Sequence, residues 1–189
     1  MNDVRRAVFL DRDGTLNVDF GYVHRSEDWQ WLPHVVEGLA RLKAAGFALV
    51  VTSNQSGIAR GMFDAATVDS LHQWVNSRLA PHKASIDSFC YCPHLPTITG
   101  NCDCRKPAPG LLLRAARELD IDLAASWSVG DRLRDAQAGL AAGCRAILVN
   151  ATAPADIPAA VTHCTDFAQV CDIILNDGAS QDETRTRCA

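Results

Sequence analysis

The sequence predicts an α/β fold built on a doubly wound parallel sheet. Short apolar runs recur along the chain and end in polar, glycine-containing turns, and stretches with helical periodicity separate them. Strands that are apolar throughout and alternate with helices are typical of a parallel sheet covered on both faces. The chain has 189 residues, of which 48% are hydrophobic and 21% are charged. We therefore expect a single Rossmann-like core.

The apolar runs give the expected strands. In chain order these are Ala7–Leu10, Ala48–Val51, Ile86–Tyr91, Trp127–Val129 and Ala146–Val149. Only about thirty residues separate the first motif from the second run, most of them the first helix and its approach. Because so short a segment cannot hold an inserted lid, we expect no large cap domain.

Four helices are expected between these strands. The first ends at Gly46, and the second begins after Asp64, whose side chain can cap a helix. The third follows Pro109. The fourth covers residues 135–142, and Gly143 suits the left-handed conformation that ends a helix.

The chain becomes less regular after Asn150. One amphipathic helix is expected around Phe167–Ile174, and the stretch Asp177–Ala189 is polar enough to form a frayed, flexible tail. We therefore predict one domain over residues 1–176 and a tail over residues 177–189.

Charge and hydropathy favour a small-molecule partner. The net charge of -4, with acidic and basic residues interspersed, provides no basic surface for nucleic acid or for an anionic membrane. No apolar run approaches the roughly eighteen residues of a membrane span. The first residues also lack the pattern of a secretion signal. We expect a cytoplasmic monomer.

Polar side chains follow several of the predicted strands. Asp11 and Asp13 follow the first strand, Ser53 and Asn54 the second, and Asp131 a later one. Ligands of open α/β sheets bind beyond the carboxyl ends of the strands, so these residues are expected to converge. Two neighbouring carboxylates need a cation, and Mg²⁺ takes oxygen ligands and bridges to phosphate. Asp11 could then attack phosphorus, while Asp13 gives and takes the proton.

Four motifs, in order, resemble those of the haloacid dehalogenase-like (HAD) phosphohydrolases. They are Asp11-x-Asp13-Gly-Thr, Ser53, Lys106 in Cys-Arg-Lys-Pro, and Asp131-x-x-x-Asp135. The resemblance implies a HAD-like fold and a phosphomonoesterase. It implies that Ser53 and Lys106 hold the phosphoryl group, and that Asp131 joins Asp11 and the Asp13 backbone carbonyl on Mg²⁺.

Two questions remain open within these motifs. A lone Asp-x-Asp-Gly-Thr segment could be a turn with solvated acids, although the ordered set of motifs argues against that reading. Asp135 could support the metal through water, orient Lys106, or cap the following helix.

A compact group of thiols and one imidazole predicts a second metal site. Cys92, His94, Cys102 and Cys104 lie within residues 92–104 and match the ligands of tetrahedral structural Zn²⁺. Four protein ligands leave no open position for substrate, so we expect zinc to order this loop, which leads into Arg105 and Lys106. The alternative is reduced thiols, or disulfides formed on oxidation.

A zinc loop of this type resembles one HAD branch, which contains heptose bisphosphate phosphatases and histidinol-phosphate phosphatases. The segments around Asp11–His24, Thr52–Gly61 and Cys102–Pro107 resemble the former more closely. That implies removal of the 7-phosphate of D-glycero-D-manno-heptose 1,7-bisphosphate, on the route to ADP- or GDP-heptose for lipopolysaccharide or other surface glycans. The implied substrate contacts are Asp19, Phe20, Gly21, Tyr22, Ser53, Asn54, Gln55, Ser56, Arg105, Lys106 and Arg132.

Two alternative functions accompany this hypothesis. One is a histidinol-phosphate phosphatase of histidine biosynthesis, and the other is a catalytically silent zinc-containing binding module. The preferred anomer is open, and His24, Arg25 and Arg60 could contact substrate or belong to a solvated loop.

Overall fold

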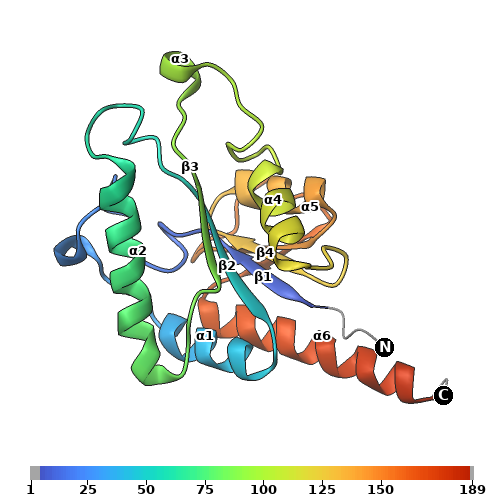
Figure 1. Ribbon diagram of the computed structural model, residues 1–189. Helices are drawn as coiled ribbons and strands as arrows, with labels where there is room; N and C mark the ends of the chain where they lie inside the picture. The colour runs from blue at the N-terminus through green and yellow to red at the C-terminus, as the bar shows by residue number, and fades with distance from the viewer. Residues whose placement is uncertain (1–4, 188–189) are drawn as a thin grey trace.

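The computed structural model describes residues 5–187, with side-chain detail as far as Asp177. Its centre is a six-stranded, fully parallel sheet in the order β3-β2-β1-β4-β5-β6, which is the Rossmann order (Figure 1). The strands are β1 (Ala7–Leu10), β2 (Ala48–Asn54), β3 (Ser88–Cys92), β4 (Trp127–Gly130), β5 (Arg145–Val149) and β6 (Val161–Cys164).

Helices cover both faces of the sheet. The α-helices are α1 (Val35–Ala44), α2 (Ala65–Leu79), α3 (Pro96–Thr99), α4 (Gly110–Leu119), α5 (Leu133–Ala142) and α6 (Phe167–Arg187). Two short 3₁₀ helices are η1 (Ser26–Asp28) and η2 (Ala80–His82). Helices α1, α2 and α6 pack on one face, whereas α4 and α5 pack on the other (Figure 1). This arrangement confirms the doubly wound fold.

Alternation along β1 shows why its run is apolar throughout. Val8 and Leu10 belong to the core formed with α1, α2 and α6, whereas Ala7 and Phe9 belong to the core formed with α4. All four side chains are fully buried. A strand covered on both faces keeps no polar side, so the motif residues come only after it ends.

The predicted helix ends are also confirmed. The carboxylate of Asp64 accepts a 2.8 Å hydrogen bond from the backbone N–H of Thr67, as an N-cap does. Gly143 closes α5 in the left-handed region, with φ of 93°. The fourth helix begins at Leu133, two residues earlier than predicted.

The carboxyl-terminal part differs from the expectation of irregular chain after Asn150. Val161–Cys164 forms β6, an edge strand in which only the first and last side chains are buried. So short a strand has no apolar run by which the sequence could reveal it. Helix α6 extends to Arg187 through most of the segment predicted as a tail, and the flexibility of that segment stays a prediction. Within residues 5–187, no helix has the length and apolar character of a membrane span.

Candidate active site

A cleft of about 310 Å³ opens beyond the carboxyl ends of β1 and β2. Its lining combines residues that are far apart in the sequence, as the strand-end rule predicted. They are Asp11, Asp13, Asp19, Gly21, Tyr22, Ser53, Asn54, Gln55, Ser56, Arg60, Leu95, Arg105 and Arg134.

One buried lysine joins two carboxylates at the base of this cleft. Lys106 Nζ lies 2.8 Å from Asp11 Oδ1 and 2.6 Å from Asp135 Oδ1, and it donates a 2.7 Å hydrogen bond to the carbonyl oxygen of Thr52. All three charged side chains are at least 95% buried. In so dry a site each charge depends on its partners.

Burial and charge act in opposite directions on these groups. Burial raises the pKa of Asp11, and the cation of Lys106 offsets part of that effect. Burial disfavours the charged form of Lys106, but Asp11 and Asp135 outweigh it and raise the lysine pKa. Lys106 is therefore a permanent cation beside the Asp11 carboxyl group.

Asp135 performs two of the three roles left open for it. Its Oδ2 accepts a 3.0 Å hydrogen bond from the backbone N–H of Arg132, so that it closes the first turn of α5. Its other oxygen pairs with Lys106. Helix capping and orientation of the lysine are thus carried by a single side chain.

Three carboxylates have the oxygen donors that Mg²⁺ requires. One oxygen each from Asp11, Asp131 and Asp135 lie within 4.8 Å of one another. Asp131 Oδ1 is buried and has no hydrogen-bond partner among the described residues, which suits a metal ligand. A Cβ atom at Gly14 would lie 2.5 Å from Asp131 Oδ2, so only glycine allows this close approach. The Asp13 side chain is not part of this group. The predicted metal ligand from Asp13 is its backbone carbonyl, so this finding and the prediction are compatible.

Mg²⁺ affinity should weaken as the pH falls. Burial raises the pKa of Asp11 and of Asp131 above the usual 3.8, so protons compete with the metal at higher pH than for an exposed aspartate. We expect Mg²⁺ binding to release protons. We also expect the Kd for Mg²⁺ to increase as the pH is lowered from about 8 to about 6. Calorimetric titration in buffers of different ionisation enthalpy measures both quantities. A Kd that is constant over this range would contradict the expectation.

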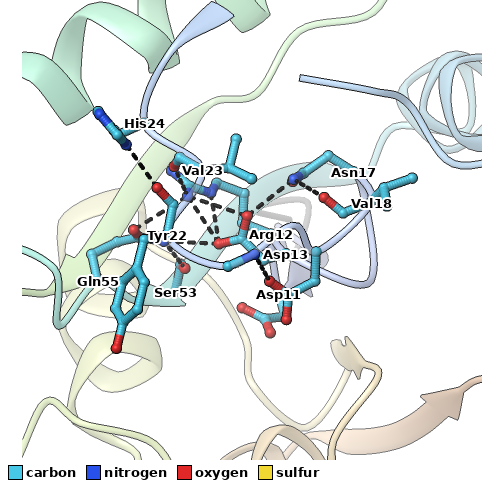
Figure 2. A network of polar contacts seen from close by, with 12 residues as sticks. Asp11, Arg12, Asp13, Asn17, Val18, Tyr22, Val23, His24, Ser53 and Gln55 are labelled. Atoms are coloured by element: carbon cyan, nitrogen blue, oxygen red, sulfur yellow. Dashed lines mark hydrogen bonds and ion pairs between the residues drawn. The ribbon is translucent and has the colours of Figure 1, made fainter. Parts of the chain in front are cut away.

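Donors from three residues surround the Asp13 carboxylate (Figure 2). They come from Arg12, Asn17 and Gln55, at 2.9–3.2 Å from its two oxygens. Gln55 also donates a 2.7 Å hydrogen bond to Ser53 Oγ. Gln55 therefore connects two of the residues predicted to act on phosphate.

Asn54 holds the backbone of Lys106 from both sides. Its Nδ2 donates to the Lys106 carbonyl and its Oδ1 accepts from the Lys106 N–H, each at 3.1 Å. This pair of hydrogen bonds joins the end of β2 to the loop that follows the cysteine cluster. The side-chain amide of this predicted substrate contact is thus already engaged by protein.

The segment after the first motif forms one rim of the cleft. Asp19, Gly21 and Tyr22 line it, whereas Phe20 is 61% exposed and is not among the lining residues. The Tyr22 ring lies 5.8 Å from the Arg60 guanidinium, which lines the cleft as well.

Arg132, a predicted substrate contact, forms ion pairs with Asp131 at 3.0 Å and with Asp19 at 3.4 Å. It is not among the residues that line the cleft. His24 stacks on Phe63 with ring centroids 4.6 Å apart. Arg25 lines a different surface hollow together with His24.

The four predicted zinc ligands lie together at the end of β3. Their ligand atoms are within 4.8 Å of one another, with Sγ–Sγ distances of 3.2–3.6 Å and His94 Nδ1 3.3 Å from Cys104 Sγ. Zn–S bonds of about 2.3 Å in a tetrahedron place sulfur atoms about 3.8 Å apart, close to these values. Arg105 Nη1 donates a 3.0 Å hydrogen bond to the His94 carbonyl, so the cluster also holds a lining arginine.

Loss of one thiolate should remove the metal and weaken turnover. We expect Cys104→Ser to bind less zinc, to unfold at a lower temperature and to lose activity, because Arg105 and Lys106 follow the cluster directly. Elemental analysis and thermal unfolding measure the first two effects. Cys144→Ala, a buried cysteine outside the cluster, should keep one zinc per chain. Wild-type protein purified without chelator but free of zinc would reject the site.

Comparison with known proteins agrees with this geometry. Residues 103–170 match the HAD-hydrolase-like family. A D-glycero-beta-D-manno-heptose-1,7-bisphosphate 7-phosphatase of Photorhabdus laumondii is 45% identical over 176 residues, covering 90% of this chain and 89% of the relative. The protein of that name from Escherichia coli K12 is 50% identical over 141 residues, which cover 72% of this chain and 74% of the Escherichia coli protein. The chain belongs to the heptose bisphosphate phosphatase family.

A solved structure from this family has the same fold. The D,D-heptose 1,7-bisphosphate phosphatase of B. bronchiseptica, complexed with magnesium and phosphate, is 38% identical, with a TM-score of 0.82. The match covers 91% of this chain and 99% of the neighbour. The magnesium and phosphate of that structure agree with the acidic group and the buried lysine found here.

Some residues at the site of this member of the heptose bisphosphate phosphatase family were not predicted from the sequence. Leu95 and Arg134 line the cleft, and Arg12 and Asn17 contact Asp13. Arg134 lies in the first turn of α5, at the sheet edge where ligands bind, and that position was the available signal. For Arg12, the signal was a charged residue in the middle of a motif that directly follows a buried strand.

Proposed function

We propose that this protein hydrolyses the 7-phosphate of D-glycero-D-manno-heptose 1,7-bisphosphate, on the route to ADP- or GDP-heptose for lipopolysaccharide or surface glycans. The observation that carries the proposal is the buried Lys106 between Asp11 and Asp135 at the base of the cleft, with an oxygen of Asp131 close to both carboxylates. A cation and a carboxylate fixed in a dry site suit phosphoryl transfer, in which charge spreads over the phosphoryl oxygens. Family membership supports this choice of substrate.

The reaction begins at Asp11. Its carboxylate oxygen attacks phosphorus, the bond to the sugar oxygen breaks, and Asp13 gives its proton to the leaving alkoxide. Ser53 and Lys106 hold the phosphoryl group. Water then attacks the aspartyl phosphate, Asp13 takes the proton from that water, and inorganic phosphate leaves while Asp11 is restored.

Mg²⁺ fits the donor set at this site. Asp11, Asp131 and the backbone carbonyl of Asp13 would hold it, with Asp135 beside them as the partner of Lys106. When bound, Mg²⁺ neutralises the negative charge of the carboxylates and of the substrate phosphate. Zn²⁺ at Cys92, His94, Cys102 and Cys104 would have a purely structural role, because all four positions are filled by protein.

The rest of the substrate would contact the rim. The contacts proposed from the family resemblance are Asp19, Phe20, Gly21, Tyr22, Ser53, Asn54, Gln55, Ser56, Arg105, Lys106 and Arg132. Arg105 is supported by its place in the cleft lining and by its hydrogen bond to His94, which fixes its direction. Binding energy gained from a remote phosphate can orient the reacting end.

We propose further that the protein is a cytoplasmic monomer with a single catalytic domain over residues 1–176. The acidic net charge of -4 supports a small-molecule partner over nucleic acid or an anionic membrane. Gel filtration with light scattering tests whether the protein is a monomer. Fractionation of cells that express the protein tests whether it is cytoplasmic.

A substrate panel tests the proposed function. We expect the heptose 1,7-bisphosphate to be preferred to histidinol phosphate by at least about a hundredfold in kcat/KM, or about 3 kcal/mol. Both anomers are included, the β anomer first because the sequence relatives are named for it. A preference for histidinol phosphate would move the protein to the other branch. Phosphate release from no substrate, generic aryl phosphates included, would favour a binding module.

A further inference from the structure

Arg12 stands between the two motif aspartates and is the largest fully buried side chain in the part of the chain that the structure describes. Its guanidinium makes a two-pronged contact with Asp13, with Nε 3.1 Å from Oδ2 and Nη2 3.2 Å from Oδ1 (Figure 2). A planar guanidinium that engages both carboxylate oxygens fixes the orientation of the carboxylate as well as its distance. A buried arginine with this geometry is therefore a candidate for positioning Asp13.

Further donors complete the same arrangement. Asn17 Nδ2 lies 3.0 Å from Asp13 Oδ1, and Gln55 Nε2 lies 3.1 Å from Asp13 Oδ2. Gln55 Oε1 in turn accepts a 3.2 Å hydrogen bond from Arg12 Nη2. The Asp13 side chain nevertheless stays 19% exposed and lines the cleft. Its inner side is held by protein while another part remains open to a ligand.

Arg12 also connects Asp13 to the rim. Its Nη2 donates a hydrogen bond to the carbonyl oxygen of Val23, which follows the rim residues Gly21 and Tyr22 (Figure 2). One guanidinium thus joins the end of β1, the residue after β2 and the rim segment. A rigid link among three segments suits a group that must be held to a fraction of an ångström.

The neighbour of Arg12 on α2 does not compete for Asp13. His72 is buried and stacks on Phe89, with ring centroids 4.2 Å apart. Burial, followed by the charge of Arg12, lowers the His72 pKa to about 3, so this imidazole is neutral at physiological pH. Arg12 therefore forms its ion pair with Asp13, and the neutral His72 carries no charge that would act on either residue.

We propose that Arg12 is the positioning residue of the acid/base step: its buried guanidinium holds the Asp13 carboxyl group in the orientation from which a proton reaches the leaving oxygen. This inference rests on the proposed function, in which Asp13 gives a proton to the alkoxide and takes one from water. Arg12 is fully buried and is not among the residues that line the cleft. Its contribution should therefore depend on how much the leaving group needs a proton.

The leaving group provides a readout that a purely structural role would not move. A sugar alkoxide needs protonation, whereas 4-nitrophenolate leaves readily without it. We expect Arg12→Met to lower kcat on the heptose bisphosphate by about a hundredfold, within the usual range for loss of acid/base catalysis, and on 4-nitrophenyl phosphate by less than about tenfold. In the Asp13→Asn background the same substitution should cost little more, because the group it positions is absent.

Two further variants keep the test decisive. Arg12→Lys retains the buried charge without the two-pronged contact, and it should show the same dependence on leaving group with a smaller loss, about tenfold on the bisphosphate. Arg145→Met is the matched control: Arg145 also pairs with an aspartate, Asp177, and lies over the Trp127 ring at 4.2 Å, and both activities should persist. If Arg12→Met does not fold, the activities of Arg12→Lys on the two substrates test the inference.

Equal losses on the two substrates in folded variants would overturn the inference, as would additive losses in the Asp13→Asn background. Failure of the proposed function gives a different result, namely a wild-type protein that does not hydrolyse the heptose bisphosphate. In that case the comparison is made between any alkyl phosphate and aryl phosphate that the wild type accepts.

Discussion

Replacing Asp11 by asparagine is expected to abolish turnover, with a loss of at least about 10⁵-fold in kcat, or about 7 kcal/mol. An amide has nearly the same volume as a carboxyl group but cannot attack phosphorus. Lys106 would keep its pairing with Asp135 and its hydrogen bond to Thr52. Phosphate release from the heptose bisphosphate, measured under single-turnover conditions, gives the size of the loss.

The fold should survive this substitution. Because burial raises the Asp11 pKa, the folded state holds its proton more tightly than the unfolded state, and the ionised carboxylate costs stability as the pH rises. A neutral amide removes that cost, so metal-free Asp11→Asn should be at least as stable as wild type above neutral pH. Asp172→Asn, which changes an exposed aspartate paired with Arg41, is the matched control with full activity. Comparable turnover by wild type and Asp11→Asn would refute the role of nucleophile.

Replacing Lys106 by methionine should damage both stability and activity. The substitution leaves Asp11 and Asp135 facing each other in a buried site without their shared cation. Removal of one partner from a buried ion pair usually costs about 3–5 kcal/mol of unfolding free energy. We expect kcat to fall by about a thousandfold or more, since a cation that holds the phosphoryl group is lost too. Denaturant unfolding and steady-state kinetics measure the two effects.

A second substitution separates them. Lys106→Met combined with Asp135→Asn removes one of the two unpaired carboxylates and should recover much of the stability without recovering activity. Lys43→Met is the surface control: Lys43 pairs with Asp87 at 2.6 Å near solvent, and its loss should cost about 1 kcal/mol or less. A Lys106→Met protein as stable as wild type, or an active double variant, would contradict the assignment.

Much of the fold followed from simple patterns in the sequence. Runs that are apolar on both faces, such as Ala7–Leu10, are typical of central strands of a covered sheet, and Asp64 and Gly143 are residue types that favour helix ends. Strand β6 was missed because this edge strand buries only its first and last side chains, and Val161–Cys164 is too short to show an apolar pattern.

The candidate site was predictable where a strand end delivers the residue. Asp11, Ser53 and Asp131 follow directly from strand order, and the cysteine cluster follows from its spacing. Contacts that depend on side-chain direction were not predictable. Asn54 turns to the Lys106 backbone and Arg12 turns inward to Asp13, and sequence position alone does not say where such side chains point.

The strand order also divides the protein into parts that can change at different rates. Asp11 and Asp131 follow β1 and β4, the two innermost strands of the sheet, and Gly14 packs against Asp131 with no room for a side chain. The rim comes from connecting loops, including the one that leaves the edge strand β3, where insertions and exchanges disturb little of the core. New substrates are therefore best sought by exchanging the loop segments around residues 19–25 and 95–101, with the four predicted metal-ligating residues of the cysteine cluster and the two central strand ends left untouched. A protein engineer could retarget the enzyme without rebuilding its chemistry.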